Sequence, residues 1–331
     1  MATQLTARII YRIIAAGFVN TPTPRIAIII PAFNAAAYIA ETLDSVLAQT
    51  LPPAEIIVVD DGSADNSAEI AATFSPQVKV LRQKNSGTAG ARQAGAGVTN
   101  SELILSVDAD DVLLPSALAT LAAALRANPA AVLAVGAAEM WTPGAANPTG
   151  PDPDVVWPGE KNFWRDLLLG NRIRTTGCVL MRRSSLVAAG GWDPDRRLLG
   201  TEDWELWLRL VEQGPFARVP ETVLKYRLHP GSFMVVQRRK VLVSAFATLA
   251  KHRARWRHDR DRSEAVANAE WANCVKVAHA TLSDARMDLA RGKFGAAFGA
   301  LAETARLGTR PLAERILTIP RRHATRVIRG V

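Results

Sequence analysis

The sequence predicts an α/β fold: a mainly parallel, Rossmann-like sheet with flanking helices, followed by a C-terminal helical extension. Short apolar runs alternate with helical patterns from residue 25 to residue 228, and this alternation is typical of βαβ units. The runs lack polar alternation, as expected for strands that are covered on both faces. After Gly231 the pattern is helical throughout.

The first part of the chain is expected to form four strands separated by three helices. The apolar runs predict strands at residues 25–30, 55–60, 78–82 and 102–107. Helical spacing predicts the connecting helices at residues 36–49, 66–73 and 88–96. Parallel strands need crossover connections of this kind.

The second part of the α/β region is less regular. A helix at 115–127 begins with a proline, which the first helical turn tolerates. The remaining elements are predicted as a strand at 132–136, a Pro- and Gly-rich loop at 141–159, a helix at 163–169, a strand at 178–182, a short helix ending at Gly190-Gly191, a helix at 202–213 and a closing strand at 223–228. The helical extension is expected to break at Gly292, at 308–311 and at Pro320.

We divide the chain into an N-terminal segment (1–23), an α/β domain (24–235, with halves 24–112 and 113–235) and a basic helical region (236–331). A composition with 48% hydrophobic and 21% charged residues excludes an intrinsically disordered chain. Two cysteines, Cys178 and Cys274, cannot form a multi-bridge scaffold, and they suit a reducing compartment.

The basic character belongs to the last region. Residues 236–331 hold 20 Lys and Arg against 8 Asp and Glu, a net charge of +12, whereas the rest of the chain has a net charge of −3. Two interpretations are open. In the first, an anionic membrane surface holds these helices; in the second, they pack on the α/β domain or on a second subunit, with the arginines solvated. Nucleic acid is disfavoured as a partner because no known binding module accompanies the charge.

The N-terminal segment is apolar from residue 5 to residue 19, but Arg8 and Arg12 interrupt it. That interruption argues against a secretory signal, and no apolar run is long enough to predict a transmembrane helix. As an amphipathic helix the segment would dock on the protein surface or lie in a membrane interface. We predict a cytoplasmic protein. If the amphipathic segment lies in a membrane interface, the protein would contact the inner face of the plasma membrane peripherally.

Polar and acidic residues follow three of the predicted strands. The strand ends read Pro31-Ala-Phe-Asn34, Asp60-Asp-Gly-Ser63 and Asp108-Ala-Asp-Asp111. Ligands of open α/β sheets bind at the carboxyl ends of the strands. Five acids without a neighbouring cation would repel one another, so the cluster predicts a bound cation or polar ligand.

Asp108-Ala-Asp-Asp111 is typical of a site for a hard divalent cation with oxygen ligands. Such a cation would neutralise a departing nucleoside diphosphate. The alternative is an acidic turn that caps the helix after Pro115. His229 follows the closing strand and is either a metal or phosphate contact or an ordinary packing residue.

Two further motifs suit a nucleotide. Asp60 and Asp61 offer acceptors to a base edge or ribose hydroxyl, or else they only close a turn in which Ser63 or Asp65 caps the next helix. Arg92 lies one turn into a helix, and its guanidinium suits phosphate or base oxygens. The alternative for Arg92 is an exposed helix residue.

Glu202 and Asp203 open an amphipathic helix directly after Gly200-Thr201. Acids are favoured at a helix start, so capping alone could explain them. An inverting sugar transfer needs a carboxylate base for the acceptor hydroxyl, and Asp203 is our candidate, with Glu202 beside it.

From about residue 25 to residue 232 the chain resembles the family 2 glycosyltransferases of the GT-A fold. The pieces that carry the resemblance are Ile30-Pro-Ala-Phe-Asn34, Val58-Val-Asp-Asp-Gly-Ser63, Ala91-Arg92 with Gly95, Val107-Asp-Ala-Asp-Asp111, Gly177 with Arg182-Arg183, Gly190-Gly191-Trp-Asp193, Thr201-Glu-Asp203 and Tyr226-Arg-Leu-His229. Each piece is weak alone, and the ordered set is specific.

The resemblance implies inversion, a Mg²⁺ or Mn²⁺ ion with a DXD-type motif, and a nucleotide-sugar donor that is commonly UDP-linked. It places Pro31, Phe33, Asn34, Asp60, Asp61, Arg92 and Asp108 at the nucleotide, Asp110 with Asp111 and His229 at the metal, and Asp203 as the base. The implied acceptor is a glycan or lipid-linked sugar of a bacterial surface polymer. Gln237-Arg-Arg lacks the tryptophan of the Gln-x-x-Arg-Trp motif, which argues against a processive synthase.

Two other functions stay open. A sugar nucleotidyltransferase would need a Gly-rich, Arg-containing loop after the first strand, which Pro31-Ala-Phe-Asn34 does not resemble. A non-catalytic nucleotide-sugar-binding protein would be expected to have lost site acids, and all of them are present here.

Overall fold

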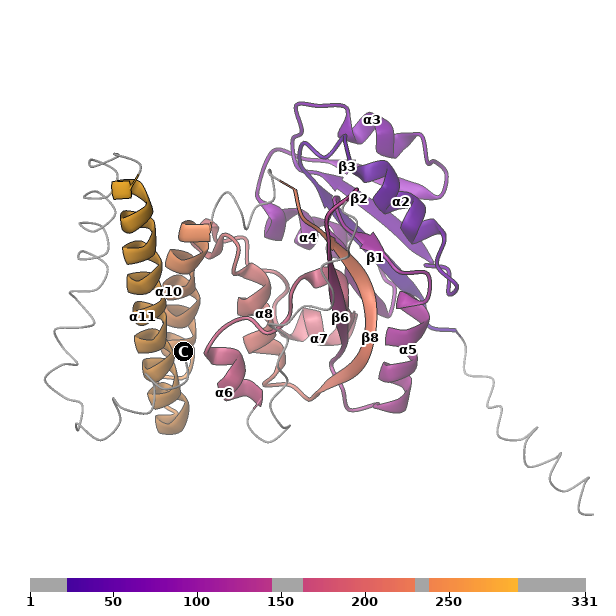
Figure 1. Cartoon of the computed structure of the whole chain (residues 1–331). Coiled ribbons are helices and arrows are strands. Elements are labelled where there is room, and N and C mark those ends of the chain that lie inside the picture. The colour runs from indigo at the N-terminus through magenta and orange to yellow at the C-terminus, as the bar shows by residue number, and fades with distance from the viewer. Residues whose placement is uncertain (1–22, 145–162, 230–237, 291–331) are drawn as a thin grey trace, which may run out of the picture.

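The computed structural model describes residues 23–144, 163–229 and 238–290. The predictions for the N-terminal segment, for most of the 141–159 loop and for the breaks after residue 290 lie outside this part. The described residues form an eight-stranded mixed sheet in the order β3-β2-β1-β4-β7-β6-β8-β5, covered by helices (Figure 1). This arrangement confirms the predicted fold class.

The parallel part of the sheet follows the prediction closely. Its strands are β1 (Ile26–Ala32), β2 (Glu55–Asp60), β3 (Val78–Arg82) and β4 (Leu103–Ser106), and the crossover helices are α2 (Ile39–Leu47), α3 (Ser67–Ala72) and α4 (Thr88–Gly97). Every residue of β1 and β4 is buried. This burial on both faces explains why these strands read as continuous apolar runs.

The other half of the sheet is partly antiparallel. β7 (Val179–Arg182) runs antiparallel to β4 and to β6 (Leu133–Trp141), and β8 (Phe216–Arg227) runs parallel to β6. A short strand, β5 (Val112–Leu113), pairs antiparallel with β8. Among the described residues four strand pairs are therefore parallel and three antiparallel.

Three boundaries differ from the prediction. β6 and β8 are longer than the runs at 132–136 and 223–228, and β5 was not predicted. Pro220 lies inside β8, where the pairing with β6 shifts register between Val135 and Ala137. An irregular register lets a strand accept a proline that lacks the ladder N–H. Because proline is rare inside strands, the local sequence pattern did not predict the first half of β8.

Shorter elements connect the two halves. They are α5 (Ala117–Ala127), α6 (Phe163–Leu168), the 3₁₀ turns η2 (Thr176–Cys178) and η3 (Arg196–Leu198), α7 (Arg183–Ala188) and α8 (Glu202–Leu210). α8 is central to this half, since its residues from Trp204 to Leu210 are all buried. Its first residues therefore hold a fixed position at the edge of the core.

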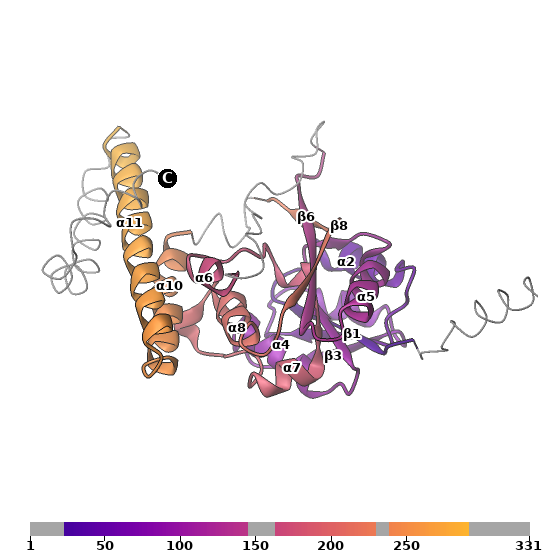
Figure 2. The ribbon, with the colours of Figure 1, turned by 90° about the horizontal axis from the view of Figure 1, so that it is seen from below.

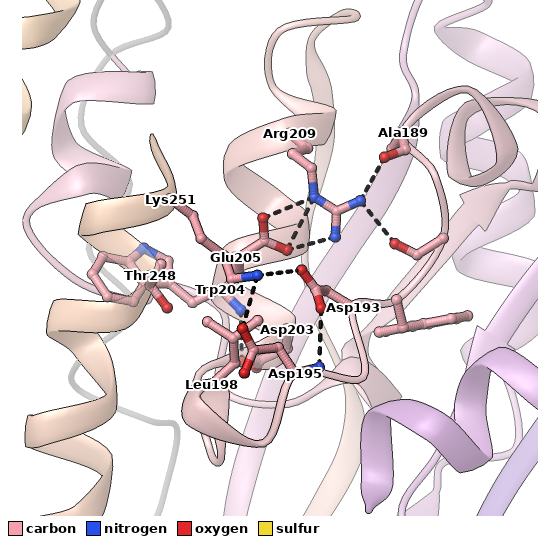
Figure 3. Close-up of polar contacts among 12 residues, drawn as sticks. Ala189, Asp193, Asp195, Leu198, Asp203, Trp204, Glu205, Arg209, Thr248 and Lys251 are labelled. Carbon is pink, nitrogen blue, oxygen red and sulfur yellow. Dashed lines mark hydrogen bonds and ion pairs between the residues drawn. The ribbon is translucent and has the colours of Figure 1, made fainter. Parts of the chain in front are cut away.

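The extension begins with two helices, α10 (Arg238–Arg255) and α11 (Arg260–Ala290), separated by a break that was not predicted. They lie side by side, on the side of α8 away from β2 and β3 (Figures 1 and 2). Thr248 shares a hydrogen bond of 2.9 Å with Thr201. Lys251 Nζ lies 2.8 Å from Asp193 and 3.0 Å from Asp195 (Figure 3). Of the two interpretations of the basic region, packing on the α/β domain is therefore confirmed for residues 238–290.

One buried ion pair fixes α8 against the turn after α7. Arg209 Nε donates to the Glu205 carboxylate at 2.9 Å, and its Nη1 donates to the Ala189 and Gly191 carbonyls (Figure 3). The Arg209 and Glu205 side chains are only 10% and 4% exposed. The pair therefore joins two chain segments in a region from which water is nearly excluded.

We predict that Arg209→Met lowers the free energy of unfolding by about 3–5 kcal/mol, because it leaves the Glu205 carboxylate buried without the guanidinium that bonds to both of its oxygens. Urea denaturation of the purified variants measures this. The control is Arg255→Met, whose side chain is 48% exposed in its pair with Glu212 and should matter by about 0–1 kcal/mol. Equal losses in both variants would contradict the role given to burial.

Candidate active site

A single continuous cavity of about 660 Å³ lies along the carboxyl ends of β1 and β4 and extends to the extension helices. Its walls come from the ends of these strands, the start of α4, the 168–176 segment, the start of α8, and one face each of α10 and α11. The position agrees with the general rule for open α/β sheets. Of the strand-end residues predicted as site residues, Asp60 and Asp111 do not line this cavity and the others do.

The first strand end forms one rim of the cavity. Pro31, Phe33 and Asn34 all line it, and the Phe33 ring is 54% exposed. Asn34 has a left-handed backbone (φ 52°), which asparagine tolerates. Its Oδ1 accepts a bond of 2.8 Å from the Ala64 N–H, so the β1 end and the β2 end are tied together. An exposed aromatic ring on a fixed rim suits stacking against a planar ligand.

Asp60 and Asp61 have different environments. Asp61 lines the cavity, and its carboxylate accepts N–H bonds of 2.8 Å from both Ser86 and Gly87. Asp60 does not line the cavity, and its Oδ1 accepts from the Ser63 N–H at 3.2 Å. The turn-closing alternative therefore describes Asp60, and the structure brings only Asp61 to the predicted nucleotide site.

Arg92 is a buried junction rather than an exposed helix residue, since it is 4% exposed. Its Nη2 donates to Asp108 Oδ1 at 2.6 Å, and its Nη1 lies 3.4 Å from Glu202 Oε1. Thr175 Oγ1 also donates to Asp108, at 3.2 Å. Arg92 thus joins α4, the β4 end and the start of α8, and it faces the cavity while neutralising two of its acids.

Asp110 and His229 lie together on the cavity wall. Asp110 Oδ2 and His229 Nε2 are 3.0 Å apart, and Asp108 lies on the same wall. Burial and the nearby Asp108 charge raise the pKa of Asp110. One carboxylate and one imidazole suit a divalent cation whose other ligands come from a bound diphosphate. No group of three or more His, Cys, Asp or Glu able to hold a metal occurs in the described part of the chain.

Asp111 does not join this pair, contrary to the predicted metal set. Its side chain is buried away from the cavity, where Oδ1 accepts the Arg227 N–H at 3.0 Å. Burial and the charges of Asp110 and Asp108 raise the pKa of Asp111 well above its ordinary value. Consecutive residues after a strand point in different directions. Asp111, which directly precedes β5, bonds to the end of β8 instead of facing the cavity.

Asp203 lines the same cavity from the first turn of α8. Its Oδ2 accepts a bond of 2.8 Å from Asn171 Nδ2, and its Oδ1 accepts from the N–H of the next residue, Trp204. The N-cap position belongs to Thr201, so Asp203 is not the capping residue. Burial and the neighbouring Glu202 charge raise the pKa of Asp203 to about 7. A carboxylate with such a pKa can accept a proton near neutral pH.

Glu202 also faces the cavity, and its Oε2 is buried without a hydrogen-bond partner among the described residues. The sequence reasoning missed the 168–176 segment, which supplies Asn171 to Asp203 and Thr175 to Asp108. It also missed the wall from α10 and α11. No helical or strand period marks the segment; its run of polar residues between two elements was the available signal.

Comparisons with known proteins match this chain to one family model and to several relatives. Residues 27–188 match the family model described as glycosyl transferase family 2. The chain is 41% identical over 100 residues to the glycosyltransferase GlyG of Streptococcus pneumoniae and 38% identical over 102 residues to an uncharacterised glycosyltransferase, YibD, of Escherichia coli. These alignments cover 29% and 30% of this chain and span only about a third of either relative, 33% and 30%.

Solved structures share the fold over a longer stretch. The structure of Staphylococcus aureus TarS residues 1–349 in complex with UDP-GlcNAc superposes with a TM-score of 0.53 and 17% identity, covering 68% of this chain and 66% of that one. Another structure of the same fragment covers 86% of this chain and 92% of that one with a TM-score of 0.51 and 18% identity. At these identities the likeness concerns the fold.

Proposed function

We propose that this chain is an inverting, non-processive enzyme that moves a sugar from a UDP-linked donor to an acceptor hydroxyl. The premise is that residues 27–188 form a family 2 glycosyltransferase domain and that the chain is a glycosyltransferase. The observation that carries the proposal is one cavity with two chemically distinct ends. Asp61 and Asp110 lie at the strand-end side, and Asp203 lies at the start of α8.

The strand-end side suits the nucleotide. The exposed Phe33 ring offers a stacking surface for the base, and Asp61 is held rigidly by backbone N–H groups at the same rim. Arg92 holds Asp108 and Glu202 in place, and its charge lowers the local negative potential that would repel a diphosphate.

Asp110 and His229 would hold a Mg²⁺ or Mn²⁺ ion, whose chemistry here is to neutralise the departing diphosphate. Asp108 contributes charge beside them while its own oxygens stay bound to Arg92 and Thr175. The raised pKa of Asp110 fits this role, since a cation would relieve the repulsion between the two carboxylates.

Asp203 would remove the proton of the attacking hydroxyl. The Asn171 amide holds its Oδ2 in one orientation, and Arg92, through Glu202, fixes the adjacent acid. Inversion requires the base and the leaving group on opposite sides of the sugar. The separation of Asp203 and Asp110 onto the α8 wall and the β4 wall of the cavity supports that arrangement.

The deciding experiment incubates the full chain with a panel of nucleotide sugars, Mn²⁺ and glycan or lipid-linked acceptors. We expect release of UDP that depends on the acceptor. Release of pyrophosphate would point to a nucleotidyltransferase, and donor binding without any turnover would point to a non-catalytic binding protein.

The raised pKa of Asp203 predicts the pH dependence of the reaction. A protonated carboxyl cannot accept the proton, so kcat/KM should fall about tenfold per unit as pH drops below about 7. The Asn171 bond favours the charged form, so Asn171→Ala should move this limb to higher pH. Steady-state rates from pH 5 to 9 measure the acid limb of kcat/KM in the wild type and in the variant. A limb that does not move in Asn171→Ala would show that Asn171 does not act on the catalytic base.

Contact with an anionic membrane stays a proposal for the rest of the basic region. Within the described ranges no helix is long and apolar enough to cross a bilayer. The last residues of the sequence include Arg321, Arg322, Arg326 and Arg329, and each basic residue near an anionic surface contributes on the order of 1 kcal/mol.

We predict that the full chain pellets with anionic vesicles at low salt and is released as salt rises. Replacing those four arginines with glutamine should abolish most of this binding, and vesicles of neutral lipid serve as the control. A wild-type chain that ignores anionic vesicles at low salt would end the membrane proposal.

A further inference from the structure

The cavity continues past Asp203 into a compartment walled by the extension helices. Val241, Leu242, Ala245 and Leu249 of α10 line it, and so do Ala269, Asn273 and Lys276 of α11. Both sets recur at helical spacing, so each helix presents one face to the cavity. The helices α10 and α11 lie on the side of α8 away from β2 and β3 (Figure 1), whereas Asp61, which lines the nucleotide end, directly follows β2.

The acidic residues of the cavity are confined to one part of its lining. Among the described residues its carboxylates come only from the strand ends and the start of α8: Asp61, Asp108, Asp110, Glu202 and Asp203. The 168–176 segment and α11 contribute none, but they contribute the cations Arg172, Arg174 and Lys276. This end of the cavity is therefore positively charged beside an apolar wall.

Arg172 and Lys276 have no acidic partner in the part of the chain that the structure describes. Within the described ranges neither forms an ion pair, and Arg172 Nε is buried with no hydrogen-bond partner. Lys276 Nζ donates to the Leu169 carbonyl at 2.7 Å, which holds the ammonium group against the 168–176 segment. Desolvation and the Arg172 charge lower the pKa of Lys276, so the two groups repel each other across a short distance.

Their position relative to the base is fixed by the chain. Arg172 directly follows Asn171, whose amide donates to Asp203. A guanidinium and an ammonium group beside each other match the oxygens of a phosphate ester, and a bound phosphate would remove their repulsion. An anion bound there would hold the rest of its molecule next to the base.

We propose that Arg172 and Lys276 form an anion subsite that binds a phosphate group of the acceptor and so presents the acceptor hydroxyl to Asp203. The inference rests on the proposed function and names the chemical class of its acceptor. The apolar face of α10 would lie along the remainder of that molecule. Two sources of the phosphate ester are a soluble glycan phosphate and a lipid headgroup.

The test is direct binding of two phosphate esters to the full chain saturated with UDP and Mg²⁺, which occupy the nucleotide end. The probes are glycerol phosphate and dihexanoyl phosphatidic acid below its micelle concentration, titrated by calorimetry. Both probes should bind. Tighter binding of the lipid by about tenfold or more would assign the source to a lipid and the chains to the α10 face, and equal affinity would assign it to a soluble glycan.

Arg172→Gln and Lys276→Gln should each weaken binding of the phosphate ester about tenfold, as expected for loss of a charge-assisted hydrogen bond. The matched control is Arg286→Gln, an exposed cation on the same helix outside the cavity, which should change affinity by less than about twofold. UDP affinity should be unchanged in all three variants.

A wild-type chain that binds UDP but neither ester would overturn the subsite and leave the proposed function intact. Full affinity in Arg172→Gln and Lys276→Gln would also overturn it, since binding would then lie elsewhere. Failure to bind UDP would instead count against the proposed function.

Discussion

Asp203→Asn is expected to lower the turnover number by about 10²–10⁴ while donor affinity stays nearly constant. The amide retains the size of the carboxylate, and its oxygen can still accept the Trp204 N–H, so the fold should be unaffected; its NH2 group replaces the oxygen that accepts from Asn171. What is lost is the group that accepts the proton, and that loss acts in the transition state. Steady-state rates and UDP-sugar titrations on the same preparation measure the two effects separately.

The matched control for this variant is Asp44→Asn, an identical change at an exposed position of α2 that does not line the cavity. Its rate should equal that of the wild type. An Asp203→Asn enzyme that lost donor affinity but kept its turnover number would assign Asp203 to donor binding and leave the reaction without its base.

Chelation and Asp110→Asn are each expected to lower the rate of sugar transfer by a factor of about 10²–10³ or more, because both take away the neutralisation of the departing diphosphate. Asp110 is partly exposed on the cavity wall, so its substitution should leave the melting temperature nearly unchanged. Rates after EDTA treatment and readdition of Mn²⁺ test the first change. Titration of Mn²⁺ in the presence of UDP tests the second.

The neighbouring acid supplies the control. Asp111 is buried and bonded to the Arg227 N–H, so Asp111→Asn should keep Mn²⁺ affinity, whereas Asp110→Asn should lose it. Transfer at the normal rate by EDTA-treated enzyme would contradict the metal role. Loss of Mn²⁺ affinity in both variants would contradict the distinction between the two aspartates.

The parallel half of the sheet and its strand-end acids could be derived from the sequence. Each strand from β1 to β4 is an uninterrupted buried run flanked by helical patterns, and these signals depend on neighbouring residues only. The acids that follow β2 and β4 lie at one sheet edge because parallel strands end on the same side. Local pattern therefore determined the fold class and the position of the nucleotide end.

Only the tertiary structure decided how the individual side chains are used. Asp60 and Asp111 have the same chemistry as Asp61 and Asp110, but the backbone directs their side chains elsewhere. Asp60 accepts the Ser63 N–H within a turn, and the buried Asp111 accepts the Arg227 N–H of β8. Arg92 meets Glu202, which lies 110 residues along the chain, because α4 and α8 pack at the same edge. Asn171 reaches Asp203 in the same way. Such contacts are set by packing between distant segments, and no local period encodes them.

The extension shows the same division. Its composition predicted basic helices, but a count of charges does not tell which face of a helix is covered. Packing buried one face of α10 and α11 against α8 and the 168–176 segment, and that packing made these helices a wall of the cavity. The sequence by itself determined that the helices exist. Their position beside Asp203, and with it the placement of Lys276 next to Arg172, follows from the burial of apolar surface between segments far apart in the chain.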